Sequence, residues 1–306
     1  MTTTNTNVGA LPAKAVIILS GGLDSATCAY IAQAKGYEIY PLTFLYGQRH
    51  IVEIECAKKI AAALGVTERH RFIELPLPKG TALVAANNMD VPEDRNLEEM
   101  SKVIPLTYVP ARNTIFMAFA LQYAEEINAD AIYIGANAID YSGYPDTRPE
   151  YIRKWQELID LATKKTVEGG KITIETPILQ MYKSEIVDWG TELGVPYEHT
   201  HSCYHPTEGN LSCGHCDSCK LRLKGWREAG KTDPLIYASR LESASLINPS
   251  LEHTGAFILN NGEDRGTAQW DTIDNPTHTV QVRWSDGAVT RESLFFLDAV
   301  QRPIEG

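Results

Sequence analysis

Short apolar runs alternate with amphipathic stretches along the first half of the chain, and this alternation restricts the fold more than any other feature. Ala15–Leu19 has the apolar character of a buried strand, and further strands are predicted at Ile39–Phe44, Arg71–Leu75 and Ala131–Gly135. Helices are expected in four stretches that follow them: from the turn after Leu19 to about Lys35, Val52–Leu64, Ile115–Ile127 and Glu150–Val167. This order predicts an α/β fold with a Rossmann-like parallel sheet, whose ligands bind beyond the carboxyl ends of the strands.

Three regions depart from this alternation. Residues 1–13 begin with a Thr- and Asn-rich stretch and are expected to form a flexible tail. Pro76–Pro105 is polar and acidic without clear periodicity, so we interpret it as a lid or an oligomer contact. Residues 239–306 carry hairpin signals such as Asn260-Asn261-Gly262 and the alternating His278–Trp284, which predict a small β-rich extension. The main domain is therefore expected to span residues 14–238.

The charge balance excludes some classes of partner. The 306 residues include 28 Lys and Arg against 39 Asp and Glu, a net charge of −11. Non-specific nucleic-acid binding depends on clustered basic side chains, so this balance argues against it. No apolar run approaches the ~20 residues of a membrane-spanning helix, and the first residues lack an export signal. We expect a cytoplasmic protein that binds neither nucleic acid nor membrane.

A glycine-rich turn, Ser20-Gly21-Gly22-Leu23-Asp24-Ser25-Ala26-Thr27, directly follows the first predicted strand. Two glycines let the backbone approach an anion, and the next helix would present free N–H groups to it. The Gly-Lys-Ser/Thr of a Walker A motif is absent. A tight turn capped by Asp24 or Ser25 is the plainer alternative. The motif resembles the PP-loop of ATP pyrophosphatases, which cleave ATP between its α- and β-phosphates and transfer AMP to a substrate oxygen.

Four cysteines, Cys203, Cys213, Cys216 and Cys219, follow the pattern C-x9-C-x2-C-x2-C. Four thiolates with this spacing suit a tetrahedral zinc ion, which would be structural because no position is left open for substrate. An iron–sulfur cluster is the competing interpretation. His201, His205 and His215 lie nearby as alternative ligands, although a loop histidine is more often solvated. Cys28 and Cys56 fall in predicted helices and are expected in the core.

Further motifs occur where strand ends should converge: Tyr46-Gly47-Gln48-Arg49-His50, Val109-Pro110-Ala111-Arg112-Asn113, Asp140-Tyr141-Ser142-Gly143-Tyr144-Pro145-Asp146 and Lys183-Ser184-Glu185. Taken singly, Arg112 could form a surface salt bridge, Tyr144 could pack in a turn and Lys183 could be solvated. In combination with the glycine-rich turn and the cysteines, these motifs closely resemble the 7-cyano-7-deazaguanine synthase family over Ala15 to Ala238. The chain departs from this family by its long C-terminal continuation and by Thr147, where the pattern usually has Cys.

This resemblance implies that residues 14–238 are a PP-loop catalytic domain that converts 7-carboxy-7-deazaguanine to its nitrile with ammonia and ATP, and that two copies form a homodimer. The implied catalytic residues are Asp24, which would pair with Mg²⁺, and Arg112 and Lys183, which would offset charge at phosphorus. The implied ATP-binding residues are Leu19, Ser20, Gly21, Gly22, Leu23, Asp24, Ser25, Ala26 and Thr27. The implied substrate-binding residues are Tyr46, Gln48, Arg49, Asn113, Asp140, Tyr144 and Asp146. Among these, Asp140, Tyr144 and Asp146 would hold the guanine-like ring.

Three other functions are consistent with parts of the sequence. A PP-loop tRNA thiolase would need a catalytic cysteine and a basic face, and neither is evident here. A related PP-loop enzyme that modifies a protein in an antiviral system would account for the C-terminal extension. A nucleotide-binding sensor would use the extension as an interaction module, but it would have no need of so many substrate-loop motifs.

Overall fold

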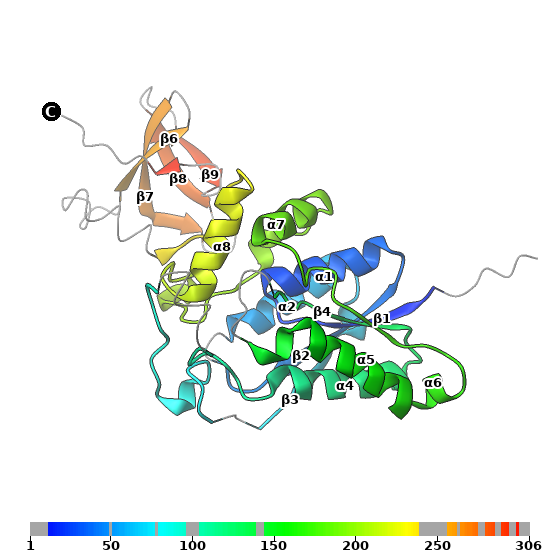
Figure 1. Cartoon of the computed structure of the whole chain (residues 1–306). Helices are drawn as coiled ribbons and strands as arrows, with labels where there is room; N and C mark the ends of the chain where they lie inside the picture. The colour runs from blue at the N-terminus through cyan, green and yellow to red at the C-terminus, as the bar shows by residue number, and fades with distance from the viewer. Residues whose placement is uncertain are drawn as a thin grey trace, which may run out of the picture. The chain divides into compact units, whose positions relative to one another are not determined.

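The computed structural model describes residues 12–48, 51–76, 79–95, 104–138 and 144–238, together with the backbone of the strands after residue 255 (Figure 1). The chain divides into two compact units. The first contains residues 1–205 and 216–233, and the second contains residues 206–215 and 234–306. Among the described residues, no helix is long and apolar enough to cross a membrane.

The first unit is built on a five-stranded parallel sheet in the order β3-β2-β1-β4-β5. Its strands are β1 (Lys14–Ile18), β2 (Glu38–Leu45), β3 (Arg71–Glu74), β4 (Ala131–Ile134) and β5 (Thr173–Glu175). The central strand β1 pairs Ala15 with Ile39 on one side and with Ala131 on the other. The parallel α/β sheet predicted from the alternation is therefore confirmed.

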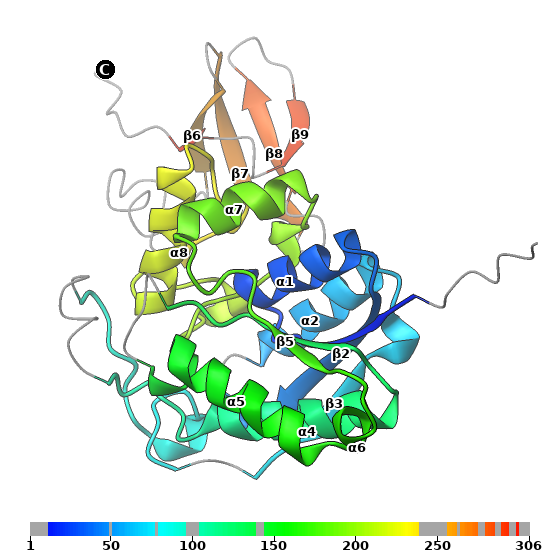
Figure 2. The same ribbon diagram turned by 45° about the vertical axis from the view of Figure 1, so that its right-hand side comes forward.

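Helices cover both faces of this sheet (Figure 2). The α-helices are α1 (Leu23–Ala34), α2 (Val52–Ala63), α4 (Arg112–Glu126), α5 (Pro149–Ala162), α6 (Lys164–Val167), α7 (Lys183–Glu192) and α8 (Asp217–Glu228). Short 3₁₀ turns are η1 (Thr67–Arg69), η2 (Ala85–Asn87), η3 (Pro145–Thr147), η4 (Tyr197–His199) and η5 (Glu208–Asn210).

Successive residues of β1 alternate between two apolar clusters, as a strand buried on both faces requires. Ala15, Ile17 and Leu19 pack with residues of α1, α2, α7 and α8, whereas Val16 and Ile18 pack with residues of α4 and α5. Cys28 in α1 and Cys56 in α2 are buried, as predicted.

The single helix predicted over Glu150–Val167 is wrong, because the chain breaks into α5 and α6 at Thr163. Thr163 leaves the helical conformation (φ −106°, ψ 142°), and its hydroxyl accepts from the Thr166 backbone N–H at 3.4 Å. A threonine competes for backbone N–H groups in this way, and a hydrophobic pattern does not reveal it.

The predicted lid region is partly packed against the main domain. Thr81, Leu83 and Val84 are buried, and the backbone of Val84 bridges to that of Gln48. Glu93 makes a second backbone bridge, to Cys216. Residues 77–78 and 96–103 lie outside the described residues, and a role as lid or oligomer contact stays a prediction.

The second unit contains an antiparallel sheet in the order β10-β6-β7-β8-β9. Its strands are β6 (Ala256–Asn261), β7 (Asp264–Asp274), β8 (Thr279–Trp284), β9 (Val289–Ser293) and β10 (Asp298–Ala299). Asn261 at the end of β6 pairs with Asp264 at the start of β7, and residues 262–263 between them, which include the glycine of the predicted Asn-Asn-Gly turn, lie outside the described residues. The predicted tail at residues 1–13 lies outside the described residues except for residues 12 and 13.

Candidate active site

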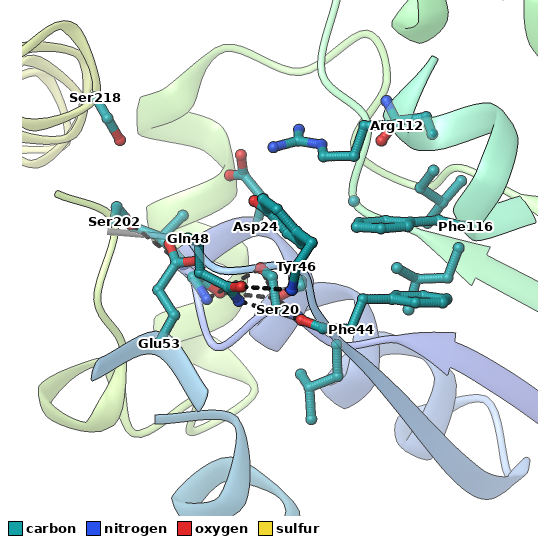
Figure 3. A pocket seen from close by; sticks show the side chains of 18 of the residues that line it. Ser20, Asp24, Phe44, Tyr46, Gln48, Glu53, Arg112, Phe116, Ser202 and Ser218 are labelled. Atoms are coloured by element: carbon teal, nitrogen blue, oxygen red, sulfur yellow. Dashed lines mark hydrogen bonds between the residues drawn. The ribbon is translucent and has the colours of Figure 1, made fainter. Parts of the chain in front are cut away.

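Two adjoining pockets form one cleft beyond the carboxyl ends of β1, β2 and β4, where a parallel sheet is expected to bind its ligands. The first lobe has an open volume of about 210 Å³ and extends along Ser20, Phe44 and Phe116 (Figure 3). The second lobe, of about 190 Å³, extends toward Lys183. Asp24, among other residues, lines both lobes.

The glycine-rich turn forms one wall of the first lobe. Gly21 has φ +89°, and a Cβ built on it would lie 2.1 Å from the Glu53 carbonyl oxygen, so only glycine fits. The Ser20 N–H donates to Ser25 Oγ at 3.1 Å, and the Ser25 hydroxyl donates to the Gly22 carbonyl at 3.1 Å. Gly22 is the N-cap of α1 and no side chain caps the helix, so the alternative of a cap by Asp24 or Ser25 is wrong. The turn and the positive end of α1 can receive an anion.

The predicted ATP-binding set divides in two. Leu19, Ser20, Gly22, Leu23, Asp24 and Ser25 line the cleft. Gly21, Ala26 and Thr27 line neither lobe, and Ala26 and Thr27 are fully buried. The Thr27 hydroxyl donates to the Leu23 carbonyl at 2.9 Å and bonds to the Tyr197 hydroxyl at 2.8 Å. Thr27 therefore fixes the helix and does not line the cleft.

Lys183 and Asp24 form an ion pair in the cleft, although 159 residues separate them in sequence. Lys183 Nζ lies 2.8 and 2.9 Å from the two Asp24 carboxylate oxygens. The Lys183 side chain is only 12% exposed, so its interpretation as a solvated lysine is wrong. Its stem passes over Gly225 of α8, where an added Cβ would lie 2.4 Å from Lys183 Cγ. Glycine at this position gives the lysine its path to Asp24.

Arg112 opens α4 directly after Ala111, which takes a left-handed conformation (φ 52°). The guanidinium points into the cleft toward Asp24, and it lies 5.9 Å from the centre of the Phe116 ring (Figure 3). Burial lowers the pKa of Arg112, but the oxygens of Tyr46, Tyr144 and Tyr204 raise it by more, so the guanidinium stays charged. Burial raises the pKa of Tyr46, which stays a neutral phenol. The cleft therefore holds a permanent cation and not a surface salt bridge.

A flat apolar wall bounds the first lobe. The rings of Phe44 and Phe116 stack with centroids 4.0 Å apart and planes 4° from parallel, and both residues line this lobe. Such a wall suits an aromatic base. In the sequence these residues fall only in a predicted strand and a predicted helix, because nothing local indicates that two distant rings will stack.

The predicted substrate-binding residues lie in different places. Tyr46, Gln48 and Asn113 line the first lobe, and Tyr144 lines the second. Gln48 also shapes the turn after β2, because its Oε1 accepts from the Tyr46 N–H at 2.9 Å and its Nε2 donates to the Phe44 carbonyl at 3.1 Å. Arg49 and Asp140 lie outside the described residues.

Asp146 is buried beneath Asn113 and is not among the residues that line either lobe. Its Oδ2 accepts from the Asn113 backbone N–H at 3.1 Å, and its carbonyl accepts from Asn113 Nδ2 at 3.1 Å. This carboxylate therefore orients the first turn of α4, and through it Asn113, which faces the cleft.

Several residues that line the cleft were not predicted. They flank the cysteines or share their helix: Ser202, Tyr204, Ser218, Leu221 and Arg222. Ser202 and Tyr204 stand on either side of Cys203, and Ser218 precedes Cys219. Proximity to the cysteine motif was the signal that could have found them.

The four cysteines lie together, all buried, with their sulfur atoms within 4.8 Å of one another, and they could hold a metal ion. Cys216 is the N-cap of α8 and Cys219 lies in its first turn, so the predicted loop region is partly helical. Backbone N–H groups of Tyr204, His205 and His215 donate to three of the sulfurs, at 3.5, 3.3 and 3.4 Å. Such donors stabilise thiolates.

Of the three histidines considered as alternative ligands, His201 is not solvated. It is only 4% exposed, and its backbone N–H donates to the Gly21 carbonyl at 3.0 Å. His205 pairs with Glu93 through Nδ1 at 2.9 Å.

Residues 14–230 match the sequence profile of the family described as queuosine biosynthesis protein QueC. A curated relative named 7-cyano-7-deazaguanine synthase, from Geotalea uraniireducens (strain Rf4), is 54% identical over 230 residues, which cover 74% of this chain and 98% of the relative. One of the same name from Trichodesmium erythraeum (strain IMS101) is 54% identical over 224 residues, 73% of this chain and 100% of the relative. The solved structure of NMN synthetase from Francisella tularensis is similar over 79% of this chain and 87% of its own, at 19% identity and a TM-score of 0.37.

Proposed function

The chain belongs to the family of the queuosine biosynthesis protein QueC, the 7-cyano-7-deazaguanine synthases, and we propose that this cleft performs both activations by which a carboxylic acid becomes a nitrile. The substrates of this proposal are 7-carboxy-7-deazaguanine, ammonia and ATP. The observation that carries it is the partly buried Lys183–Asp24 pair at the glycine-rich turn, because it puts a cation and a carboxylate beside the backbone that would receive the phosphates of a nucleotide.

ATP would occupy the first lobe. Its base fits against the stacked rings of Phe44 and Phe116, and its β- and γ-phosphates fit the turn at Ser20 and Gly22. Asp24 would hold the Mg²⁺ that accompanies nucleotide phosphates, since carboxylate oxygens are its preferred protein ligands. In this arrangement Lys183 leaves Asp24 for a phosphate oxygen, so the resting ion pair keeps both groups in place until the nucleotide arrives.

The acid would lie in the second lobe, beside Tyr144 and Asn137. A carboxylate oxygen attacks the α-phosphorus, the bond to the β-phosphate oxygen breaks, and pyrophosphate leaves. Ammonia then attacks the acyl carbon and releases AMP and a proton, which gives the amide. Lys183 and Arg112 offset the charge that develops on the phosphoryl oxygens.

The second activation repeats the first with the amide oxygen as nucleophile. Attack on a second ATP releases pyrophosphate and one proton, and loss of AMP with the remaining N–H proton forms the C≡N bond. Because both attacks come from an oxygen on the same carbon, one arrangement of Lys183 and Arg112 can serve both steps.

We propose zinc as the metal of the four-cysteine site. Four sulfurs at the usual Zn–S distance of ~2.3 Å lie ~3.8 Å apart in a tetrahedron. The Cys203 and Cys216 sulfurs are 3.9 Å apart, and all four lie within 4.8 Å, which fits one ion. Zinc bound here would cross-link the segment at Cys203 to the start of α8 and would take no part in the chemistry.

The test is to incubate the protein with the acid, ammonia and ATP and to follow nitrile, amide and AMP by mass spectrometry. We expect two AMP per nitrile and no ADP. Lys183→Ala should lower the rate by at least about 100-fold, the scale of losing one charge-stabilising group. Lys154→Ala is the matched control, since this lysine is 71% exposed. ADP as the sole nucleotide product, or a normal rate for Lys183→Ala, would contradict the proposal.

A further inference from the structure

Arg222 of α8 is a buried cation that the proposed chemistry leaves without a role. Its side chain is 3% exposed, and the residue borders the second lobe. Asp233 holds it in a bidentate ion pair, with Nε donating to Oδ2 at 2.7 Å and Nη2 donating to Oδ1 at 3.0 Å. A guanidinium held by a bidentate carboxylate has its charge satisfied, so its remaining donors act by orienting their acceptors.

Those donors reach the segment that connects α7 to the cysteine site. Nη1 donates to the Thr200 hydroxyl at 2.8 Å, and Nη2 donates to the Tyr197 carbonyl at 3.3 Å. Nη1 also lies 3.5 Å from the Ser202 hydroxyl. One planar group therefore fixes three points of residues 197–202. A lysine, with one nitrogen, cannot reproduce this pattern.

The same segment holds the glycine-rich turn from its outer side. The His201 backbone N–H donates to the Gly21 carbonyl at 3.0 Å, and the Ser202 hydroxyl lies 3.5 Å from the Leu23 backbone N–H. One turn further along α1, the Tyr197 hydroxyl bonds to that of Thr27 at 2.8 Å. These hydrogen bonds connect the turn and α1 to the segment that Arg222 orders.

We infer that Arg222, fixed by Asp233, is a positioning residue that holds the glycine-rich turn in its phosphate-binding shape through residues 197–202. The inference rests on the proposed placement of the ATP phosphates at this turn. It predicts that a change at Arg222 weakens ATP binding more than acid binding, because the segment bonds directly to the glycine-rich turn, whereas Ser202 is its only residue that lines the second lobe.

The test compares Arg222→Lys with wild type in the full chain with its metal bound. We measure the KM for each substrate and kcat, ATP binding by calorimetry without the acid, metal content and thermal unfolding. We expect Arg222→Lys to keep its metal, to raise the dissociation constant of ATP at least tenfold and to change the KM for the acid by less than twofold. Thr200→Val, which removes one acceptor and keeps the shape, should raise the ATP dissociation constant in the same direction by a smaller factor.

Lys165→Met is the control for a general loss of stability. Lys165 pairs with Asp130 at 2.9 Å and is only 17% exposed, but neither residue lines the cleft. The Lys165→Met variant should have the same dissociation constant for ATP as the wild type, even if its unfolding temperature is lower. Thr200→Val is expected to fold, so it keeps the inference testable if Arg222→Lys does not.

Three results would overturn the inference. Unchanged ATP binding in both Arg222→Lys and Thr200→Val would show that the segment does not shape the turn. A rise in the KM for the acid alone would make Arg222 a direct substrate contact. If ATP binding and acid binding weaken equally and the metal is lost as well, Arg222 has only a general structural role. Failure of the wild type to bind ATP would instead refute the proposed function.

Discussion

The variant Gly225→Ala tests whether the position of the Lys183 side chain determines the rate of AMP release. A Cβ at residue 225 would lie 2.4 Å from Lys183 Cγ and 2.8 Å from its Cβ. Ordinary contact begins at 3.4 Å, so the lysine stem or α8 must shift by about 1 Å. The Lys183 ammonium sits 2.8 Å from Asp24, and its position depends on that stem. A misplacement of ~1 Å in a reacting group costs roughly 100-fold in rate, or about 2.7 kcal/mol of transition-state stabilisation.

Stability should change much less than activity. Alanine is favoured over glycine inside a helix by about 1 kcal/mol, whereas crowding a packed site costs about 1–3 kcal/mol. These terms oppose each other, so we expect a small net change in the free energy of unfolding with a large loss of rate. The assay is the initial rate of AMP release at saturating substrates, together with the thermal midpoint. Arg227→Ala, on the exposed face of the same helix, is the control.

A double variant decides whether the effect passes through the lysine. If Gly225→Ala acts only by displacing Lys183, it should cause no further loss in a Lys183→Ala background. Losses that multiply would mean that the two changes act separately. A rate for Gly225→Ala within a factor of three of wild type would refute the reasoning altogether.

Three further outcomes follow from the structure. Cys216→Ser removes one of four sulfur ligands, so metal affinity should fall by more than about 100-fold and the thermal midpoint should drop, as checked by metal analysis and melting curves. Burial lowers the pKa of His70, whose Nε2 bonds to Thr43, to about 4. Because the unfolded chain binds this proton near pH 6.5, stability should fall by up to about 2 kcal/mol from pH 7 to pH 5, and His70→Gln should flatten that dependence in denaturant titrations. Phe116→Leu removes the ring that stacks on Phe44, so the KM for ATP should rise about 3–10-fold with kcat nearly unchanged, as measured by AMP release.

The sequence by itself determined the sheet and the location of its ligand loops. Apolar runs of strand length and amphipathic stretches with helical period are local patterns, and they predicted β1 to β4 and the helices α1, α2 and α4. The cysteine spacing predicted that four sulfurs would come together where they could hold a metal ion, because these residues are close in sequence, and the combination of short motifs identified the family. The strand β5 was not predicted, because three residues are too short to show a period.

The tertiary structure decided which of these residues act on one another. Lys183 reaches Asp24 across 159 positions only because Gly225 lets α7 and α8 approach closely, and no local pattern contains that information. Asp146 turned out to lie beneath Asn113, and the Thr27 side chain turned out to face Tyr197 and not the cleft, since the direction of a side chain depends on how its element packs. Short-range steric effects and the spacing of apolar residues determine the helices and strands. Side-chain pairs such as Lys183 and Asp24 form only through contacts between segments far apart in the chain.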